Sequence, residues 1–297
     1  MIVPEFADYS FLEGAVDLHI HTGPDYVKRY ADSIDLAREA AAAGMRAIIL
    51  KTHLVSTVAG AYAADRVVEE VRVFGGIALN DANGCFNLRN VAAALKSGGK
   101  MIWMPTVDAA YALDKAKNGH WIGHYVNGSV FGYPRNALTV LDDAGNLKDD
   151  VREIVRLCRE YDAILGTGHL SPSESLKLAR EAKDIGYDKL EVTHPNAWLE
   201  DFTIPVMKEL AALGATMTLS YGVCSPHNGR QDPAEIVQVV KEVGADHCCL
   251  ITDYGQVASP SPVEGFRVFC QLLNNLGVSR DEIDRMAKTN PARLLAL

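Results

Sequence analysis

The first apolar run of the chain ends in the stretch Asp17-Leu18-His19-Ile20-His21-Thr22-Gly23-Pro24-Asp25. Side chains on a β-strand alternate between its two faces, so His19 and His21 point to the same side. Two imidazoles one strand repeat apart can bind one divalent metal ion. The stretch therefore predicts a metal site at the end of the first strand.

Strand-like and helix-like segments alternate along the rest of the chain. Most of the strand-like segments are apolar throughout, which is typical of parallel strands covered on both faces. Eight β/α units in about 300 residues predict an α/β fold, a (β/α)8 TIM barrel. A doubly wound open sheet is the alternative, but no G-x-G-x-x-G motif follows the first strand to support a dinucleotide-binding version of it. The eight expected strands are 15–20, 45–50, 73–79, 101–105, 163–166, 189–193, 215–220 and 248–251.

Helix starts are marked by three similar tetrapeptides, each with a capping residue, a proline at the first helical position and a glutamate three residues after the cap. They are Ser171-Pro172-Ser173-Glu174, Asp232-Pro233-Ala234-Glu235 and Ser261-Pro262-Val263-Glu264. Gly186, Gly244 and Gly277 follow the corresponding helices and suit left-handed caps. Further helices are expected at 33–43, 56–70, 88–96, 149–161 and 204–213.

One connection is too long for an ordinary strand–helix loop. It spans residues 107–147 after the fourth strand, and it contains several glycines and two histidines. We interpret it as a lid-like insertion over the mouth of a single barrel domain, residues 1–297. The insertion is also a candidate surface for association into a homo-oligomer.

The composition limits the classes of partner. The formal net charge is -9 and no basic cluster stands out, which argues against nucleic-acid binding, since that requires Lys and Arg to neutralise phosphates. No apolar run approaches the roughly 18 residues of a membrane-spanning helix. The N-terminus has no basic start and no apolar signal core, so we expect a cytoplasmic protein. The six cysteines form no C-x-x-C pair, and most are expected to be buried thiols.

Three more strand ends carry metal-binding residue types. His169, His194 and Asp253 each follow an expected strand. The carboxyl ends of barrel strands meet at one mouth, where reactive groups gather. Imidazoles with one carboxylate suit zinc, and also manganese, iron or nickel. A zinc ion lowers the pKa of a bound water to about 7, and Asp253 is the natural group to carry the proton from that water to a leaving group.

These residues together resemble the amidohydrolase superfamily of metal-dependent hydrolases. The resemblance covers nearly the whole chain: H-x-H on the first strand, histidines after the fifth and sixth, and aspartate after the eighth. It extends to Lys288-Thr289-Asn290-Pro291-Ala292-Arg293-Leu294-Leu295, which is similar to the segment that often closes these barrels. The resemblance implies a TIM barrel and an enzyme that uses a bound metal to hydrolyse C–N or ester bonds.

The resemblance also implies roles for individual residues. His19, His21, His169 and His194 would be metal ligands or neighbours of the metal site, and Asp253 would be both ligand and general base. In members with one ion, the counterpart of His194 often polarises the substrate carbonyl instead. We expect one ion rather than two.

The chain departs from the family pattern at the fourth strand. Many two-metal members have a carboxylated lysine or a glutamate there, whereas this chain has Met101-Ile102-Trp103-Met104-Pro105-Thr106. The second strand instead ends in Lys51-Thr52-His53. Lys51 could bind a substrate carboxylate or phosphate, or ligate a metal if carboxylated, and His53 could join the metal or the substrate. Both could also simply line the barrel rim.

Weaker signals point to substrate contacts. Asp25 follows the H-x-H turn, and His227 and Arg230 lie in the loop after the seventh strand. Each is a candidate substrate-binding residue, with an ordinary polar loop as the alternative for His227 and Arg230.

The sequence thus predicts a metal-dependent hydrolase acting on an amide, cyclic amide or lactone-type bond of a small molecule. Asp253, His194 and Lys51 are the expected catalytic residues. A decarboxylase, isomerase or phosphoesterase on the same barrel is the first alternative, because the fold does not select the reaction. A non-catalytic metal-binding barrel is the second.

Overall fold

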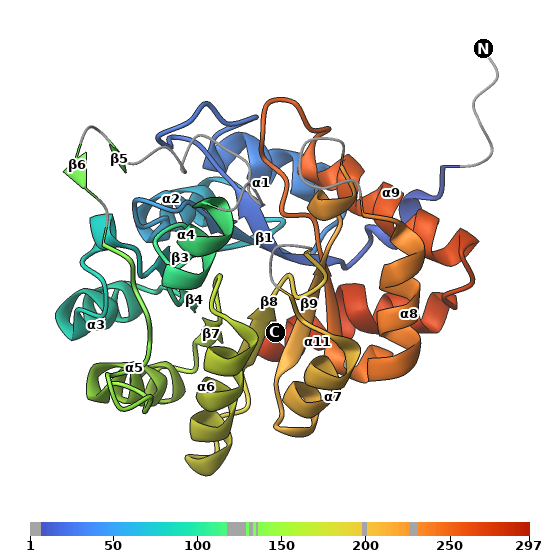
Figure 1. Ribbon diagram of the computed structural model, residues 1–297. Coiled ribbons are helices and arrows are strands. Elements are labelled where there is room, and N and C mark those ends of the chain that lie inside the picture. Colours follow the sequence, from blue (N-terminus) through green and yellow to red (C-terminus); the bar gives the residue numbers. More distant parts are fainter. Residues whose placement is uncertain (1–6, 118–128, 131–132, 135, 198–200, 226–230) are drawn as a thin grey trace.

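The computed structural model describes residues 7–117, 129–130, 133–134, 136–197, 201–225 and 231–297. Eight parallel strands form a barrel in the order β1-β2-β3-β4-β7-β8-β9-β10, and helices surround it (Figure 1). The predicted (β/α)8 barrel is confirmed. The strands are β1 Val16–His21, β2 Ala47–Lys51, β3 Arg72–Ala78, β4 Met101–Trp103, β7 Ile164–Gly166, β8 Leu190–Thr193, β9 Thr216–Ser220 and β10 Cys248–Ile251.

Each expected strand is found, with ends that differ from the prediction by at most two residues. The helices are α1 Ser33–Ala42, α2 Val58–Val67, α3 Leu88–Lys96, α4 Ala110–Lys117, α5 Asp149–Glu160, α6 Pro172–Asp184, α7 Ile204–Ala212, α8 Pro233–Val243, α9 Pro262–Asn275, α10 Arg280–Asp284 and α11 Asn290–Leu295. Helix α2 is the shortest relative to its prediction, because the backbone at Val68 is already extended.

The three expected helix starts differ in which capping hydrogen bonds they form. Ser171 and Glu174 form a complete capping box at α6. Asp232 caps α8 through the backbone N–H of Ala234. Ser261 accepts from the N–H of Glu264 at α9, but the Glu264 carboxylate binds Arg267 instead of returning to the cap. All three predicted glycines adopt positive φ.

The barrel interior below the mouth is apolar and is closed by the C-terminal helix. Val16, Leu18, Ile49 and Trp103 from the strands pack in one cluster with Leu294 and Leu295 of α11. The amide of Asn290 donates to the carbonyls of Ala245 (2.8 Å) and Cys248 (2.7 Å) at the start of β10. The Asn-Pro-Ala segment therefore ties α11 to the base of the barrel.

The barrel closes where the end of β10 meets the end of β1. The backbone N–H of Asp253 donates to the carbonyl of His19 (3.0 Å), and that of His21 donates to the carbonyl of Tyr254 (2.7 Å). Gly255 follows with φ +128°, and a Cβ at this position would lie 1.9 Å from the carbonyl oxygen of His21. Only glycine allows these two segments of the backbone to approach each other this closely.

The described part of the insertion begins with α4 and continues with two short antiparallel strands, β5 Ser129–Val130 and β6 Tyr133–Pro134. Ala110 donates to the carbonyl of Leu138 (2.7 Å), which brings the two ends of the insertion together beside β4. Its two histidines, His120 and His124, lie outside the described residues.

The cysteines of the chain are free thiols, and most of them are buried. Four cysteines are buried, Cys85 and Cys224 are half-buried, and all six are thiols. Within the described ranges no helix has the length and apolar character that crossing a membrane requires.

The closure of the barrel predicts a large effect of Gly255→Ala. The added Cβ would overlap the His21 carbonyl and would adopt an unfavourable φ, so we expect the free energy of unfolding to fall by about 3 kcal/mol. Urea denaturation measures it. Gly277→Ala is the matched control, since it has φ +95° but no atom within 4 Å of the added Cβ, and it should cost about 1 kcal/mol. Equal losses in the two variants would contradict the close-approach explanation.

Candidate metal centre

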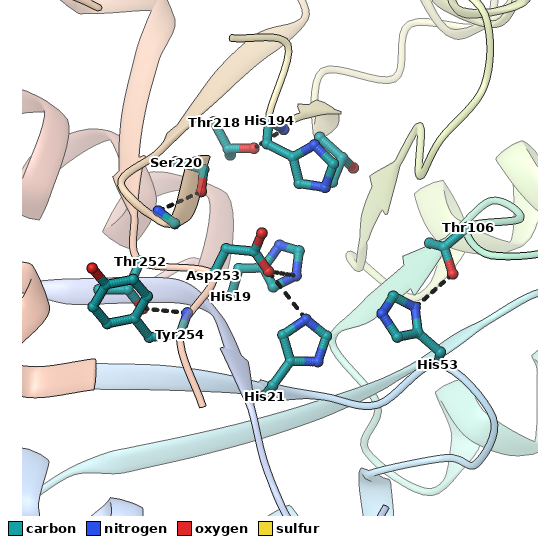
Figure 2. A network of polar contacts seen from close by, with 12 residues as sticks. His19, His21, His53, Thr106, His194, Thr218, Ser220, Thr252, Asp253 and Tyr254 are labelled. Atoms are coloured by element: carbon teal, nitrogen blue, oxygen red, sulfur yellow. Dashed lines mark hydrogen bonds and ion pairs between the residues drawn. The ribbon is translucent and has the colours of Figure 1, made fainter. Parts of the chain in front are cut away.

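Five strand ends bring histidines and an aspartate to one mouth of the barrel. β1 carries His19 and His21, and residues just after β7, β8 and β10 supply His169, His194 and Asp253. His53 follows β2 (Figure 2). The structure thus assembles the metal-binding residue types that the sequence placed at separate strand ends.

The most compact part of this group joins β1 to β10. Nε2 of His19 lies 3.2 Å, and Nε2 of His21 lies 3.0 Å, from the same oxygen, Oδ1 of Asp253 (Figure 2). One ligand atom from each of the three residues lies within 4.8 Å of the other two. The two histidine side chains are nearly inaccessible, whereas that of Asp253 is 16% exposed. A cation at this point would have three protein ligands and an approach from solvent.

Five imidazole rings form a closed loop around the mouth. Proceeding from His19 to His21, His53, His169, His194 and back to His19, the ring centres are 5.3, 5.0, 6.1, 5.1 and 5.9 Å apart. All five side chains are buried. Each imidazole therefore has two other imidazoles as neighbours. These neighbours are close enough for one bound ion or one small substrate to contact more than one ring.

Burial sets the protonation state of this loop. Removal from water lowers the pKa of all five imidazoles, well below the usual range for His19, His21, His53 and His169 and to about 4 for His194. The neighbouring Lys51 charge lowers them further. Neutral imidazoles keep a nitrogen lone pair, which is the form that binds a metal.

Lys51 lies at the end of β2, inside the barrel. Its side chain is fully buried, and its Nζ lies 5.1 Å from the centre of the Trp103 ring. Its charge lowers the pKa of the histidines and of Asp253. The structure therefore places Lys51 beside the site residues, where the sequence predicted it.

Asp253 is held in an unusual backbone conformation. Its φ is +56°, and His194 has φ +32°; both values are uncommon for residues with a side chain. Asp17 anchors this region from β1, since its carboxylate accepts from the Thr252 hydroxyl (2.5 Å) and from the N–H of His19 (3.0 Å). The strained position of Asp253 is thus fixed by the residue next to it, and such strain is common at functional sites.

A second buried acid lies deeper, on β8. The carboxylate of Glu191 accepts from the hydroxyls of Thr193 (2.7 Å) and Thr218. Burial raises its pKa to about 7, and the hydroxyls oppose that rise. Gly166 makes room for it, because a Cβ there would lie 2.5 Å from the carboxylate. Burial likewise raises the pKa of Asp17 to about 7.

The predicted substrate contacts have different outcomes. Asp25 is buried in an ion pair with Arg29, with Oδ2 2.6 Å from Nη2 and 2.7 Å from Nε. His227 and Arg230 lie outside the described residues. Arg29 was not expected, although its charge lowers the pKa of His21 and Asp253. No local pattern marks Arg29, whereas the period of two in β1 could have identified Asp17, which lies on the same face as His19 and His21.

Comparison with known proteins gives a family and a fold. The model of a family of unknown function, DUF6282, matches residues 14–218. No curated protein matches the sequence. Among solved structures, the chain resembles an amidohydrolase from Pseudomonas aeruginosa, with 13% identity, a TM-score of 0.63 and 97% of each chain covered.

Two further solved structures extend the comparison. A dipeptidase described as a metallopeptidase has 12% identity and a TM-score of 0.62, over 96% of this chain and 98% of that one. A 2,6-dihydroxybenzoate decarboxylase has 14% identity and a TM-score of 0.53, over 96% and 100%. These structural neighbours are amidohydrolase-superfamily members, so the resemblance predicted from the sequence is confirmed at the level of the fold.

Glu191→Gln tests the buried acid on β8. With a pKa of about 7 when folded and 4.5 ordinarily, Glu191 binds a proton more tightly in the folded state. Wild-type stability should therefore fall as the pH rises from 4.5 to 7, by about 3 kcal/mol from this group at about 1.4 kcal/mol per pKa unit, and stay level above. The variant should lack this component in urea denaturation with a chelator present.

The difference between wild type and variant isolates Glu191 from the histidines, which titrate in both. Glu160→Gln on the exposed surface of α5 is the control and should follow the wild type. Parallel pH curves for Glu191→Gln and wild type would contradict this prediction, because they would show that Glu191 has the same pKa in the folded and the unfolded protein.

Proposed function

The chain belongs to a family of unknown function, DUF6282, and from its site we propose that it is a metal-dependent hydrolase of small molecules. The observation that carries this proposal is the convergence of two histidine nitrogens on one oxygen of Asp253 at the barrel mouth. Three protein ligands with an open fourth position are typical of a catalytic zinc site.

The residues fit a divalent cation. The imidazoles of His19 and His21 are neutral because they are buried, and Asp253 supplies a carboxylate oxygen. His169 and His194 lie in the same ring of imidazoles and are further ligands or neighbours in this proposal. Zinc is the expected ion, and manganese, iron and nickel accept the same donors.

A divalent ion at this point supplies a Lewis acid and lowers the pKa of water. The protein's own residues supply the rest. Burial raises the pKa of the Asp253 carboxyl, which suits a group that takes a proton and returns it near neutral pH. His194, a neutral imidazole, can donate one N–H to the oxyanion that forms on a carbonyl. The buried Lys51 adds a positive charge that favours the same oxyanion.

We propose an amide, cyclic amide or lactone-type bond as the target. The structural neighbours include proteins described as an amidohydrolase and a dipeptidase, and also a decarboxylase. The proton shuttle assigned to Asp253 is what hydrolysis of a C–N bond needs, because the amine must be protonated as it leaves.

The metal content of the protein tests the first part of the proposal. We expect at least one equivalent of divalent metal per chain by plasma mass spectrometry, after purification without chelator. His19→Ala should lose most of it, because it removes one of the three converging ligands. The exposed His247, at the opposite end of β10, provides the control His247→Ala, which should keep wild-type metal content. Wild-type protein that stays metal-free after incubation with zinc and with manganese would refute the proposal.

Asp253→Asn tests the proton shuttle. Asparagine has the same shape and tolerates positive φ, so the fold should be kept while the proton acceptor is lost. We expect kcat to fall at least about 100-fold on any substrate found in a panel of lactones, cyclic amides and N-acyl amino acids. Circular dichroism and metal content are measured in parallel. Asp149→Asn, exposed at the start of α5, is the control, and wild-type turnover by Asp253→Asn would exclude the assigned role.

A further inference from the structure

We propose that Glu191 is a positioning residue of the barrel mouth. Through the hydroxyls of two threonines, this buried carboxylate fixes the backbone that carries His169 and His194. The inference deepens the proposed function and rests on it for the roles of the two histidines in the chemistry, whereas their placement can be measured without it. Glu191 lies on β8 below the mouth, and the proposed proton shuttle does not involve it.

Glu191 and its two threonine partners form a compact buried group on one face of the sheet. Thr193 lies two residues further along β8, on the same face as Glu191, and Thr218 of β9 is paired with Thr193 in the sheet. The hydroxyl of Thr193 donates to Oε2 of Glu191 (2.7 Å), and that of Thr218 donates to Oε1. All three side chains are buried. Each carboxylate oxygen thus directs one hydroxyl.

One of the threonines holds the backbone of His194. The N–H of His194 donates to the hydroxyl oxygen of Thr218 (3.3 Å; Figure 2). His194 has φ +32°, a conformation that a residue with a side chain keeps only where its surroundings fix it. The carbonyl of Val192 also lies 3.0 Å from the Thr218 oxygen, but the Glu191 carboxylate is closer and, when ionised, is the stronger acceptor. The Thr218 hydrogen therefore points to Glu191, and its lone pairs remain for the N–H of His194.

The other threonine holds the backbone that leads to His169. The N–H of Gly168 donates to the hydroxyl oxygen of Thr193 (3.0 Å). Gly168 has φ +58° and comes directly before His169, whose own N–H donates to the carbonyl of Pro105 (3.0 Å). The backbone on which His169 enters the mouth is therefore fixed by the segment after β4 and by the threonine of β8.

A single charge directs both threonines. An ionised carboxylate accepts hydrogen bonds and donates none, so both hydroxyls donate to Glu191 and accept from the backbone. A hydroxyl that donates to an ionised group becomes a better acceptor itself, because hydrogen bonds in a chain polarise one another. The two threonine hydrogen bonds also oppose the rise in the pKa of Glu191 that burial causes, so they favour this ionised form. Loss of the charge is therefore expected to loosen both histidine-bearing segments together.

The placement of His194 matters for the proposed chemistry. An oxyanion donor acts only within hydrogen-bond distance of the developing charge, and a misplacement of about 1 Å can reduce a rate about 100-fold. Glu191 touches neither reacting group in this proposal, so its effect reaches the reaction through the backbone of His169 and His194. A carboxylate that merely filled the barrel interior would instead affect the stability of the whole mouth.

Amide hydrogen exchange, measured by NMR at pH 8, tests the hold on both segments. At this pH, above its pKa of about 7, Glu191 is ionised. In Glu191→Gln, we expect the amides of Gly168 and His194 to exchange about 10-fold faster than in the wild type, because both hydroxyls lose an ionised acceptor. The amide of His21, which donates to a backbone carbonyl and not to a threonine, is the internal reference. Glu160→Gln, on the exposed surface of α5, is the control variant.

Threonine variants separate the two branches. Thr218→Val keeps the shape of the side chain but removes the acceptor, so it should accelerate exchange at His194 by about 10- to 100-fold and spare Gly168. Thr193→Val should do the reverse. Thr218→Ser and Thr193→Ser keep the hydroxyl and should restore wild-type exchange. The 15N shifts of the His194 imidazole should move in Glu191→Gln and in Thr218→Val, and return in Thr218→Ser.

Steady-state kinetics link the placement to the reaction. On any substrate found in the panel of lactones, cyclic amides and N-acyl amino acids, Glu191→Gln and Thr218→Val should lower kcat about 10- to 100-fold. KM should change by less than about 3-fold, because the displaced ring acts in the transition state and not in substrate binding. Thr218→Ser should recover most of kcat.

The outcomes separate this inference from the proposed function. Wild-type exchange at Gly168 and His194 in Glu191→Gln would overturn it, and so would an equal acceleration at His21, because the carboxylate would then act only on general stability. Unchanged kcat beside faster exchange would overturn it as well. Absence of metal binding and of any turnover would refute the proposed function, while the exchange rates and imidazole shifts would still decide the placement. If Glu191→Gln fails to fold by circular dichroism, the comparison of Thr218→Val with Thr218→Ser decides.

Discussion

The contact of two histidine nitrogens with one oxygen of Asp253 is the point on which this structure depends, because it joins the first strand of the barrel to the last. The same meeting closes the barrel through backbone hydrogen bonds between His19, His21 and the residues after β10. The closure of the barrel and the candidate metal site therefore use the same few residues. Gly255 makes both possible, since a side chain at this position would push the segment after β10 away from His21.

The concentration of buried polar groups around this contact has an energetic consequence. Five neutral imidazoles, a lysine and the acids Asp17 and Glu191 all lie within the upper part of the barrel. Taking such groups out of water is unfavourable unless each is hydrogen-bonded or binds a ligand. Threonine hydroxyls donate hydrogen bonds to both acids. A bound cation would accept the lone pairs of the imidazoles. Metal binding would therefore stabilise the fold as well as supply chemistry.

The sequence predicted the elements of the fold and the position of most site residues, because both follow from local periodicity. Apolar runs gave the eight strands, and a period of two placed His19 and His21 on one face. The strand ends gave His169, His194 and Asp253, because all parallel strands of a barrel end at the same mouth. The roles proposed for these residues remain predictions.

What the sequence did not predict depends on contacts between distant segments. Arg29 reaches the site because residues 22–32 fold back, with Gly23 paired to Asp32 and Arg29 paired to Gln256. The orientation of His53 depends on Asn80 and Thr106, which follow two other strands. No spacing within one segment reports such pairs. The left-handed backbone of Asp253, with φ +56°, likewise occurs where the end of β10 meets β1.

The fold of this chain recurs in solved structures of low sequence identity. At 12–14% identity, proteins described as a dipeptidase and as a decarboxylase have this fold. The barrel therefore fixes where ligands can be placed, and the choice of strand fixes which ligands are present. Here β4 ends without an acid or a lysine, and β2 ends with Lys51 and His53. Because the ends of parallel strands face the same mouth, a residue after β2 lies at the same centre as a residue after β4 but has different neighbours. His53 then lies beside His21 on one side and His169 on the other, between the groups that β1 and β7 supply.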